Sequence, residues 1–138
     1  MKIFLNEDVH TAALERIKYC FDHFDNVLVA FSGGKDSGVL LNLCYDYAHQ
    51  MGKLDKMAMY HLDYEAQYKK TTEYVMETFN TLDGIRKFWL CLPISAQCAV
   101  NMRNPGLWFP WSTDEKDIWV RPLPDHPAVF HQNNVPFC

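Results

Sequence analysis

The sequence predicts an α/β protein: a three-layer α/β/α arrangement around a mainly parallel, twisted sheet. Short, uncharged apolar runs, typical of strands that a parallel sheet buries on both faces, alternate with longer segments in which apolar residues recur at helical spacing. This alternation favours parallel strands joined by right-handed crossovers. At 138 residues, 49% of them hydrophobic, the chain is long enough to build one core, so we expect residues 1–138 to form a single domain.

The first expected elements are a helix over about residues 6–23, a strand over 27–31 and a helix over 37–51. Asn6 is a residue type that caps helices, and apolar residues then recur every three or four positions. The strand is an unbroken apolar run. The second helix is followed by Gly52, a residue type that commonly ends helices.

The next expected elements are a strand over residues 57–62, a helix over about 65–80 and a strand over 87–92. Asp63 directly follows the first of these strands, and Pro93 ends the second. Ligands of parallel α/β sheets bind beyond the carboxyl ends of the strands. We therefore expect the loop after the strand over residues 27–31 to line one crevice together with Asp63 and Pro93.

The rest of the chain has weaker patterns. We expect a short helix over residues 94–102, a turn at 104–106 and a short strand over 118–121. The aromatic run of residues 107–111 could pack in the core or form a lid over it. It could instead stack on a nucleotide base. Packing is the commoner role of such clusters.

A glycine-rich turn links the first strand to the second helix and reads Ser32-Gly33-Gly34-Lys35-Asp36-Ser37. Its glycines allow backbone conformations that other residues avoid, and they let a ligand approach closely. The unpaired amides of a first helical turn attract anions, Lys35 adds a positive charge, and Ser32 and Ser37 add hydroxyl donors. The turn therefore predicts a phosphate site, although it matches neither the Walker A loop nor the Rossmann glycine fingerprint.

Further polar residues are candidates for the same site. Asp63 and Glu65 could hold Mg²⁺ or accept hydrogen bonds from a ribose or amino group. Asp63 could also cap the next helix, with Glu65 in its first turn, and the two roles are compatible. Arg121 could bind a phosphate or sulfate through its guanidinium, or it is a solvated surface residue. Cys91 is interpreted as structural, and Cys98 could face the crevice, but neither has the CxxC spacing of a reactive thiol.

Composition narrows the range of partners. The net charge of −4, without a cluster of basic residues, argues against a nucleic-acid surface. The sequence has no apolar run of membrane-spanning length, and the apolar stretch at residues 1–5 is too short for a signal peptide. The odd number of cysteines, five, is typical of reduced thiols, so we expect a cytoplasmic protein without a membrane partner.

The turn matches the SGGxDS signature in full, and the chain thus resembles the PP-loop ATP pyrophosphatase superfamily, whose adenine nucleotide alpha hydrolase-like fold is Rossmann-like. The resemblance implies that the turn holds ATP by its phosphates and that ATP is cleaved between its α and β phosphates. Lys35 and Asp36 would then be catalytic, and Mg²⁺ would bind through Asp36 or Asp63. The nucleotide-binding residues that we expect are Phe31, Ser32, Gly33, Gly34, Lys35, Asp36, Ser37, Leu62, Asp63, Glu65 and Arg121.

Other segments resemble the phosphoadenosine phosphosulfate (PAPS) reductase branch, in particular the reductase-like proteins related to the immunoglobulin-binding regulator A. They are Glu15-Arg16-Ile17, Asp63-Tyr64-Glu65-Ala66-Gln67-Tyr68, Cys91-Leu92-Pro93-Ile94 and Trp119-Val120-Arg121-Pro122. Members of this branch continue into a further strand and an arginine-bearing segment, so we expect a C-terminally shortened member or an N-terminal portion. The Glu-Cys-Gly-(Leu/Ile)-His motif of true reductases is absent, so we do not expect sulfonucleotide reduction.

Three functions remain open. The chain could cleave ATP to adenylylate or otherwise activate an unknown acceptor substrate. It could be a non-catalytic nucleotide-binding regulatory module. It could also bind PAPS, with thiols supplied by a partner. Exposed apolar residues after Leu107 are compatible with a homo-oligomer, or with a partner that completes the C-terminal side of the site.

Overall fold

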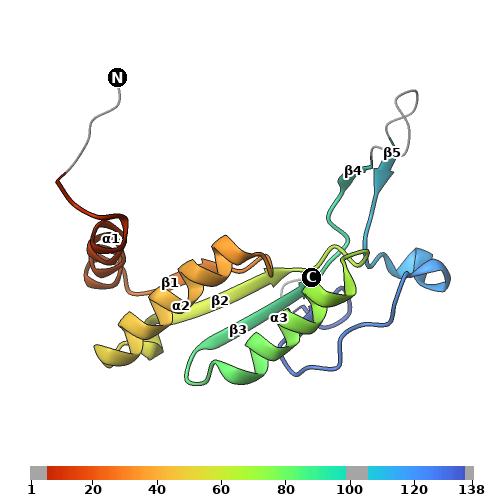
Figure 1. Cartoon of the computed structure of the whole chain (residues 1–138). Coiled ribbons are helices and arrows are strands. Elements are labelled where there is room, and N and C mark those ends of the chain that lie inside the picture. The colour runs from red at the N-terminus through yellow and green to blue at the C-terminus, as the bar shows by residue number, and fades with distance from the viewer. Residues whose placement is uncertain (1–5, 99–105, 136–138) are drawn as a thin grey trace.

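The computed structural model describes residues 6–98 and 106–135 of the chain. Its centre is a sheet of four parallel strands in the order β1-β2-β3-β6. The strands are β1 (Val27–Ala30), β2 (Met57–Leu62), β3 (Arg86–Cys91) and β6 (Val129–His131). Figure 1 shows the strands side by side, with helices α2 and α3 lying over them. The predicted parallel α/β fold is therefore confirmed.

Within residues 6–98 and 106–135, three α-helices accompany the sheet: α1 (Val9–His23), α2 (Lys35–Gln50) and α3 (Lys69–Thr81). The residue that caps α1 is Asp8 rather than the predicted Asn6, because the Asp8 carboxylate accepts a hydrogen bond from the Thr11 amide at 2.9 Å. A short 3₁₀ helix, η1 (Leu54–Lys56), precedes β2. None of the helices in the described stretches is both long enough and apolar enough to cross a membrane.

One face of the sheet forms the core. Its side chains are almost completely buried and come from every strand: Val29, Met57, Met59, His61, Trp89, Cys91 and Val129. The opposite face is more open, since Leu28 is 57% exposed and Phe88 and Phe130 are only half-buried. Within the described residues, no helix covers this second face as completely as helices cover the first. The second helical layer of the expected α/β/α arrangement is therefore not seen in this part of the chain.

The C-terminal third departs from the expected elements. Residues 96–98, where the sequence predicts part of a helix over 94–102, form strand β4 (Ala96–Cys98), which pairs antiparallel with β5 (Gly106–Trp108). The expected strand over 118–121 is also wrong, because a 3₁₀ helix, η2 (Thr113–Ile118), occupies its first residue and a bend follows. The first two residues of the predicted turn at 104–106 lie outside the described residues.

Candidate functional site

The glycine-rich turn lies between β1 and the N-terminus of α2. Gly33 has a φ of +80°, a conformation that residues with a side chain rarely adopt. Gly34 has an extended backbone conformation and directly precedes the first residue of α2. In the described part of the chain, no side chain caps this helix. Among the described residues, no hydrogen-bond acceptor is recorded for the backbone amides of Lys35, Asp36 and Ser37. These amides are available to an anion, and the helix dipole favours negative charge there.

Hydroxyl groups organise the turn internally. The Ser32 and Ser37 hydroxyl oxygens lie 2.9 Å apart, and the Ser37 oxygen also accepts the Ser32 amide at 3.2 Å. The Ser37 hydroxyl in turn donates to the Gly34 carbonyl at 3.0 Å. The turn therefore has a defined shape before any ligand binds, which lowers the entropy that binding must fix.

The charged residues of the turn point into solvent. The ammonium group of Lys35 lies 2.9 Å from a carboxylate oxygen of Asp36, and both side chains are 90% exposed. An ion pair with this exposure contributes little to stability. The Lys35 side chain is consequently free to exchange Asp36 for a more strongly charged anion.

Close packing against α3 requires glycine in the turn. A Cβ atom on Gly33 would lie 2.7 Å from Cγ2 of Thr71 and 2.9 Å from Cγ2 of Val75, both below van der Waals contact. A Cβ atom on Gly38 of α2 would likewise lie 3.0 Å from the Tyr74 hydroxyl oxygen. Helix α3 thus packs closely against the turn and the start of α2.

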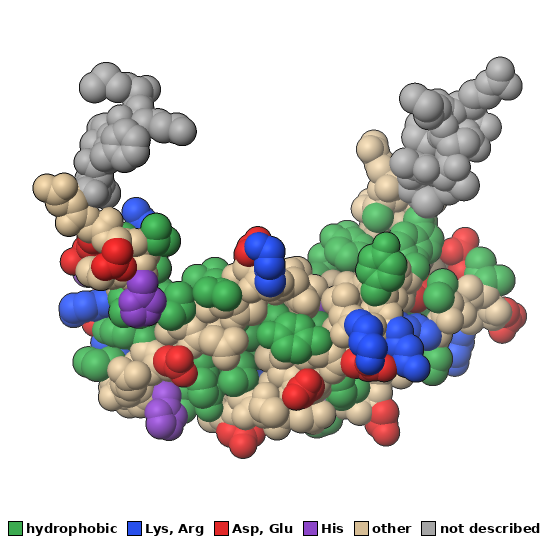
Figure 2. Space-filling view, viewed as in Figure 1, with side chains coloured by type: hydrophobic (Ala, Val, Ile, Leu, Met, Phe, Trp, Pro, Cys, Tyr) green, Lys and Arg blue, Asp and Glu red, His purple; other side chains and the backbone are tan. Residues whose placement is uncertain are grey.

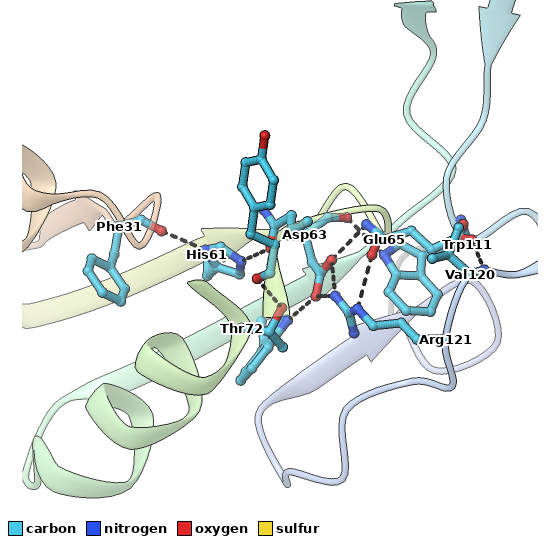
Figure 3. Close-up of polar contacts among 11 residues, drawn as sticks. Phe31, His61, Asp63, Glu65, Thr72, Trp111, Val120 and Arg121 are labelled. Carbon is cyan, nitrogen blue, oxygen red and sulfur yellow. Dashed lines mark hydrogen bonds and ion pairs between the residues drawn. The ribbon is translucent and has the colours of Figure 1, made fainter. Parts of the chain in front are cut away.

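A second polar cluster lies where β2 and β3 end, and it centres on Asp63 (Figure 3). The Asp63 side chain is fully buried, and Nη2 of Arg121 lies 2.7 Å from both of its carboxylate oxygens. One of those oxygens also accepts the indole N–H of Trp89 at 2.7 Å. Arg121 therefore forms an ion pair within the protein, and the hypothesis that it is a solvated surface residue is wrong.

Glu65 joins two distant parts of the chain. Its carboxylate accepts the backbone amide of Trp111 at 2.9 Å and that of Val120 at 2.6 Å. Its own amide donates to Asp63 at 2.8 Å, and its φ of 62° is in the left-handed region. The Asp63–Glu65 segment is thus a tight turn, and α3 begins only at Lys69. The interpretation of Asp63 as a helix cap is wrong.

His61, which the sequence analysis did not single out, connects the two parts of the site. It is fully buried on β2. Its Nδ1 lies 2.7 Å from the carbonyl oxygen of Phe31, directly before the glycine-rich turn, and its Nε2 lies 3.1 Å from the Gln67 side-chain oxygen. A histidine in an apolar strand carries no sequence signal for such a role, because its partners are 30 and 6 residues away.

The structure therefore distributes the expected site residues over two neighbouring groups. Residues 32–37 form the glycine-rich turn, whereas Asp63, Glu65 and Arg121 form a buried network that includes Trp89 and Trp111. In the described stretches, no group of three or more acidic, histidine or cysteine side chains is arranged to hold a metal ion. Burial raises the pKa of the Cys91 thiol, and the Asp63 charge raises it further, in agreement with a structural role. The side chain of Cys98 lies outside the described part.

Comparisons with known proteins agree with this architecture. The family model described as the phosphoadenosine phosphosulfate reductase domain matches residues 26–104. A protein of Escherichia coli (strain K12), described as uncharacterized protein YbdN, is 38% identical to the chain over 125 residues. That alignment covers 89% of this chain and 30% of YbdN, so the chain spans less than a third of the length of this curated relative.

Proposed function

Since the chain belongs to the phosphoadenosine phosphosulfate reductase domain family, a family of nucleotide-binding proteins, we propose that residues 32–37 bind the phosphates of an adenine nucleotide. The observation that carries the proposal is the set of backbone amides of Lys35, Asp36 and Ser37, which have no acceptor among the described residues and lie in a preformed turn at the N-terminus of α2. The flanking strand ends, with Phe31 on one side and Leu62 on the other, are expected to contact the rest of the nucleotide.

We further propose that the nucleotide is ATP and that it is cleaved between the α and β phosphates. An oxygen of the acceptor substrate would attack the α phosphorus, and pyrophosphate would leave with the electron pair of the broken P–O bond. The amides of the turn and the Lys35 ammonium group would stabilise the negative charge that develops on pyrophosphate. Lys35 suits this role because its present partner, Asp36, is fully solvated and easily exchanged.

Mg²⁺ would bind chiefly to the phosphates, with Asp36 as the protein ligand. Magnesium sites for nucleotides typically use one or two carboxylates together with phosphate oxygens and water. The Asp36 carboxylate is solvent-exposed at the mouth of the turn, whereas both oxygens of Asp63 are engaged by Arg121. Asp36 is therefore the better candidate of the two expected ligands.

Both carboxylate oxygens of Asp63 already accept hydrogen bonds from Arg121. This favours a second candidate function, a module that binds the nucleotide without cleaving it. If Asp63 and Arg121 serve only to hold the chain together, neither is available to the reacting phosphates. The two candidates predict different products, since only the enzyme releases pyrophosphate from ATP. The AMP group is then joined to the acceptor when the acceptor attacks, and is released as free AMP when water attacks in its place.

The first test is calorimetric titration of the protein with ATP, AMP and PAPS, each with and without Mg²⁺. We expect Lys35→Ala to weaken binding of the preferred nucleotide by about tenfold or more, because it removes a charged donor to phosphate. Lys69→Ala, a similarly exposed lysine outside the turn, is the matched control. Equal nucleotide affinity of the Lys35 and Lys69 variants would contradict binding at the turn. Tighter binding of PAPS than of ATP would show that the ligand is a sulfonucleotide and not ATP.

A second measurement separates the enzyme from the binding module. Labelled ATP is incubated with the protein, and AMP and pyrophosphate are quantified over time. Release that disappears in Lys35→Ala supports cleavage at the turn. Tight binding without any product supports the non-catalytic module.

A further inference from the structure

A small cavity lies beside the Glu65 turn, away from residues 32–37. Its volume is about 300 Å³, and its walls are mostly aromatic and aliphatic. The principal lining residues are Glu65, Trp108, Phe109, Glu115, Ile118 and Trp119. Figure 2 shows hydrophobic side chains gathered over this end of the molecule, near β4 and β5, with acidic side chains beside them.

The walls of the cavity are held in place by hydrogen bonds. Glu65 fixes the backbone at both ends of residues 111–120 through the amides of Trp111 and Val120. The indole N–H of Trp119 donates to the Ser112 carbonyl at 2.9 Å, which orients the ring. The cavity is therefore part of the folded structure and does not have to be created by a ligand.

The electrostatic environment of the cavity is negative. Glu65 is only 3% exposed, and no cationic side chain within 4.0 Å of its carboxylate is recorded in the described part of the chain. The nearby Arg121 is paired with Asp63, and the cavity-lining Glu115 adds a second negative charge. Two backbone amides stabilise the Glu65 carboxylate, but no opposite charge is recorded beside it in the described residues, and it borders an open, apolar space.

Aromatic rings facing a negative cavity suit a cation. Ring faces attract cations electrostatically, and quaternary ammonium groups are recognised by such aromatic walls. The chain already uses this interaction: the Lys116 ammonium group lies 5.9 Å from the centroid of the Trp119 ring. Lys116 lines a neighbouring hollow, and among the described residues no ion pair joins it to Glu65 or Glu115.

We propose that this cavity binds a small organic cation, such as a quaternary or alkylated ammonium group. Trp108, Phe109 and Trp119 would surround the alkyl groups, and Glu65 and Glu115 would supply the opposite charge. The proposal concerns a site separate from the phosphate-binding turn, and it does not depend on nucleotide binding there.

Choline is a suitable probe, and 3,3-dimethyl-1-butanol is its uncharged analogue of nearly equal shape. Both are titrated into the protein by calorimetry, while NMR follows the indole N–H signals. We expect choline to bind saturably, to shift the Trp108 and Trp119 signals, and to bind at least about threefold more tightly than the neutral alcohol. Equal binding of both compounds would show an apolar pocket without cation selectivity and would overturn the proposal, as would an absence of saturable binding.

Matched variants locate the site. Glu115→Gln and Phe109→Ala should each weaken choline binding by about three- to tenfold. Asp114→Asn makes the same charge change within η2, and Leu107→Ala makes a similar truncation in β5, but neither residue lines the cavity. Because all four side chains are exposed, the variants should fold. Equal losses in the control variants would contradict binding in the cavity.

Discussion

The guanidinium group of Arg121 lies 2.7 Å from both carboxylate oxygens of Asp63, a residue 58 positions earlier in the chain. The same side chain donates through Nε to the Glu65 carbonyl at 3.0 Å and lies over the Trp111 ring, 4.9 Å from its centroid. One arginine thereby joins the loop after β2 to the C-terminal third of the chain. Its Nε and Nη2 atoms both donate to groups of the protein, which argues for a role in assembling the site.

Arg121→Ala should lower the free energy of unfolding by about 3 kcal/mol, because it leaves the buried Asp63 carboxylate without its counter-charge. Arg121→Lys should restore only part of that loss, since lysine lacks the planar array of donors that reaches both Asp63 and Glu65. Urea unfolding measures the effect. Arg16→Ala, on an exposed face of α1, is the control, and an Arg121→Ala protein of equal stability would show that the pair contributes nothing.

The turn at Gly33 allows a sharper comparison. Gly33 and Gly52 both have positive φ, of 80° and 65°. A Cβ atom at Gly33 would meet neighbours, whereas one at Gly52 would have none within 4 Å among the described residues. Gly52→Ala should therefore cost about 1 kcal/mol from backbone strain alone. Gly33→Ala should cost about 1–3 kcal/mol more, through its clash with α3.

Gly33→Ala should also weaken nucleotide binding, because the turn must move away from α3 to accommodate the methyl group. Unfolding measurements on both variants, together with nucleotide titrations, check this. Equal destabilisation of the two proteins would contradict the close packing of the turn, and unchanged nucleotide affinity in Gly33→Ala would show that the turn tolerates the shift.

How well the sequence predicts each structural element depends on how far apart in the chain the interacting residues are. Apolar runs and glycines act locally, so the parallel strands, the helices between them and the turn at residues 32–37 could be anticipated. The helix expected from residue 65 begins at Lys69 because Glu65 adopts a left-handed conformation and binds amides far along the chain. Neither constraint is visible in a local pattern.

The C-terminal third was predicted least well for the same reason. Residues 96–98 have no strong strand pattern, and they form β4 because β5 is available to pair with them. Strand β6 follows directly after a proline-rich segment that suggests a loop, and it forms because β3 offers a free edge. At Val120 the amide donates to Glu65 instead of to a neighbouring strand. Each of these outcomes depends on a partner distant in sequence.

The buried thiols give a prediction about reactivity. Burial raises the pKa of Cys44 to about 11, so at pH 8 only about one molecule in a thousand carries the reactive thiolate. Cys91 is also buried, and its pKa is raised by burial and by Asp63. Iodoacetamide at pH 8 should therefore label the half-buried Cys20 in the native protein before it labels either of these residues.

Peptide mass mapping follows the modification of the three thiols. In denaturant all three should react at similar rates, which provides the control. Native-state labelling of Cys44 as fast as that of Cys20 would show that the contact between α2 and the sheet opens readily.

Asp22 connects α1 to the segment after α2, and this connection should depend on pH. Its carboxylate accepts hydrogen bonds from Lys18 at 2.7 Å and from Lys53 at 2.6 Å, which lower its pKa from 3.8 to about 2. A carboxyl whose pKa is lower in the folded state than in the unfolded state stabilises the fold above the unfolded pKa. This contribution should be fully present above pH about 5 and lost as the pH falls through 4 towards 2.

Unfolding free energies measured between pH 2 and 6, for the protein and for Asp22→Asn, test this directly. The difference between the two proteins should be largest at pH 6 and should shrink as Asp22 becomes protonated, since the neutral carboxyl resembles the amide. Asp46→Asn, an exposed carboxylate of α2 with no ion pair recorded in the described residues, should show no such convergence. A constant difference between the protein and Asp22→Asn across this range would mean that the lysines do not stabilise the charged form of Asp22.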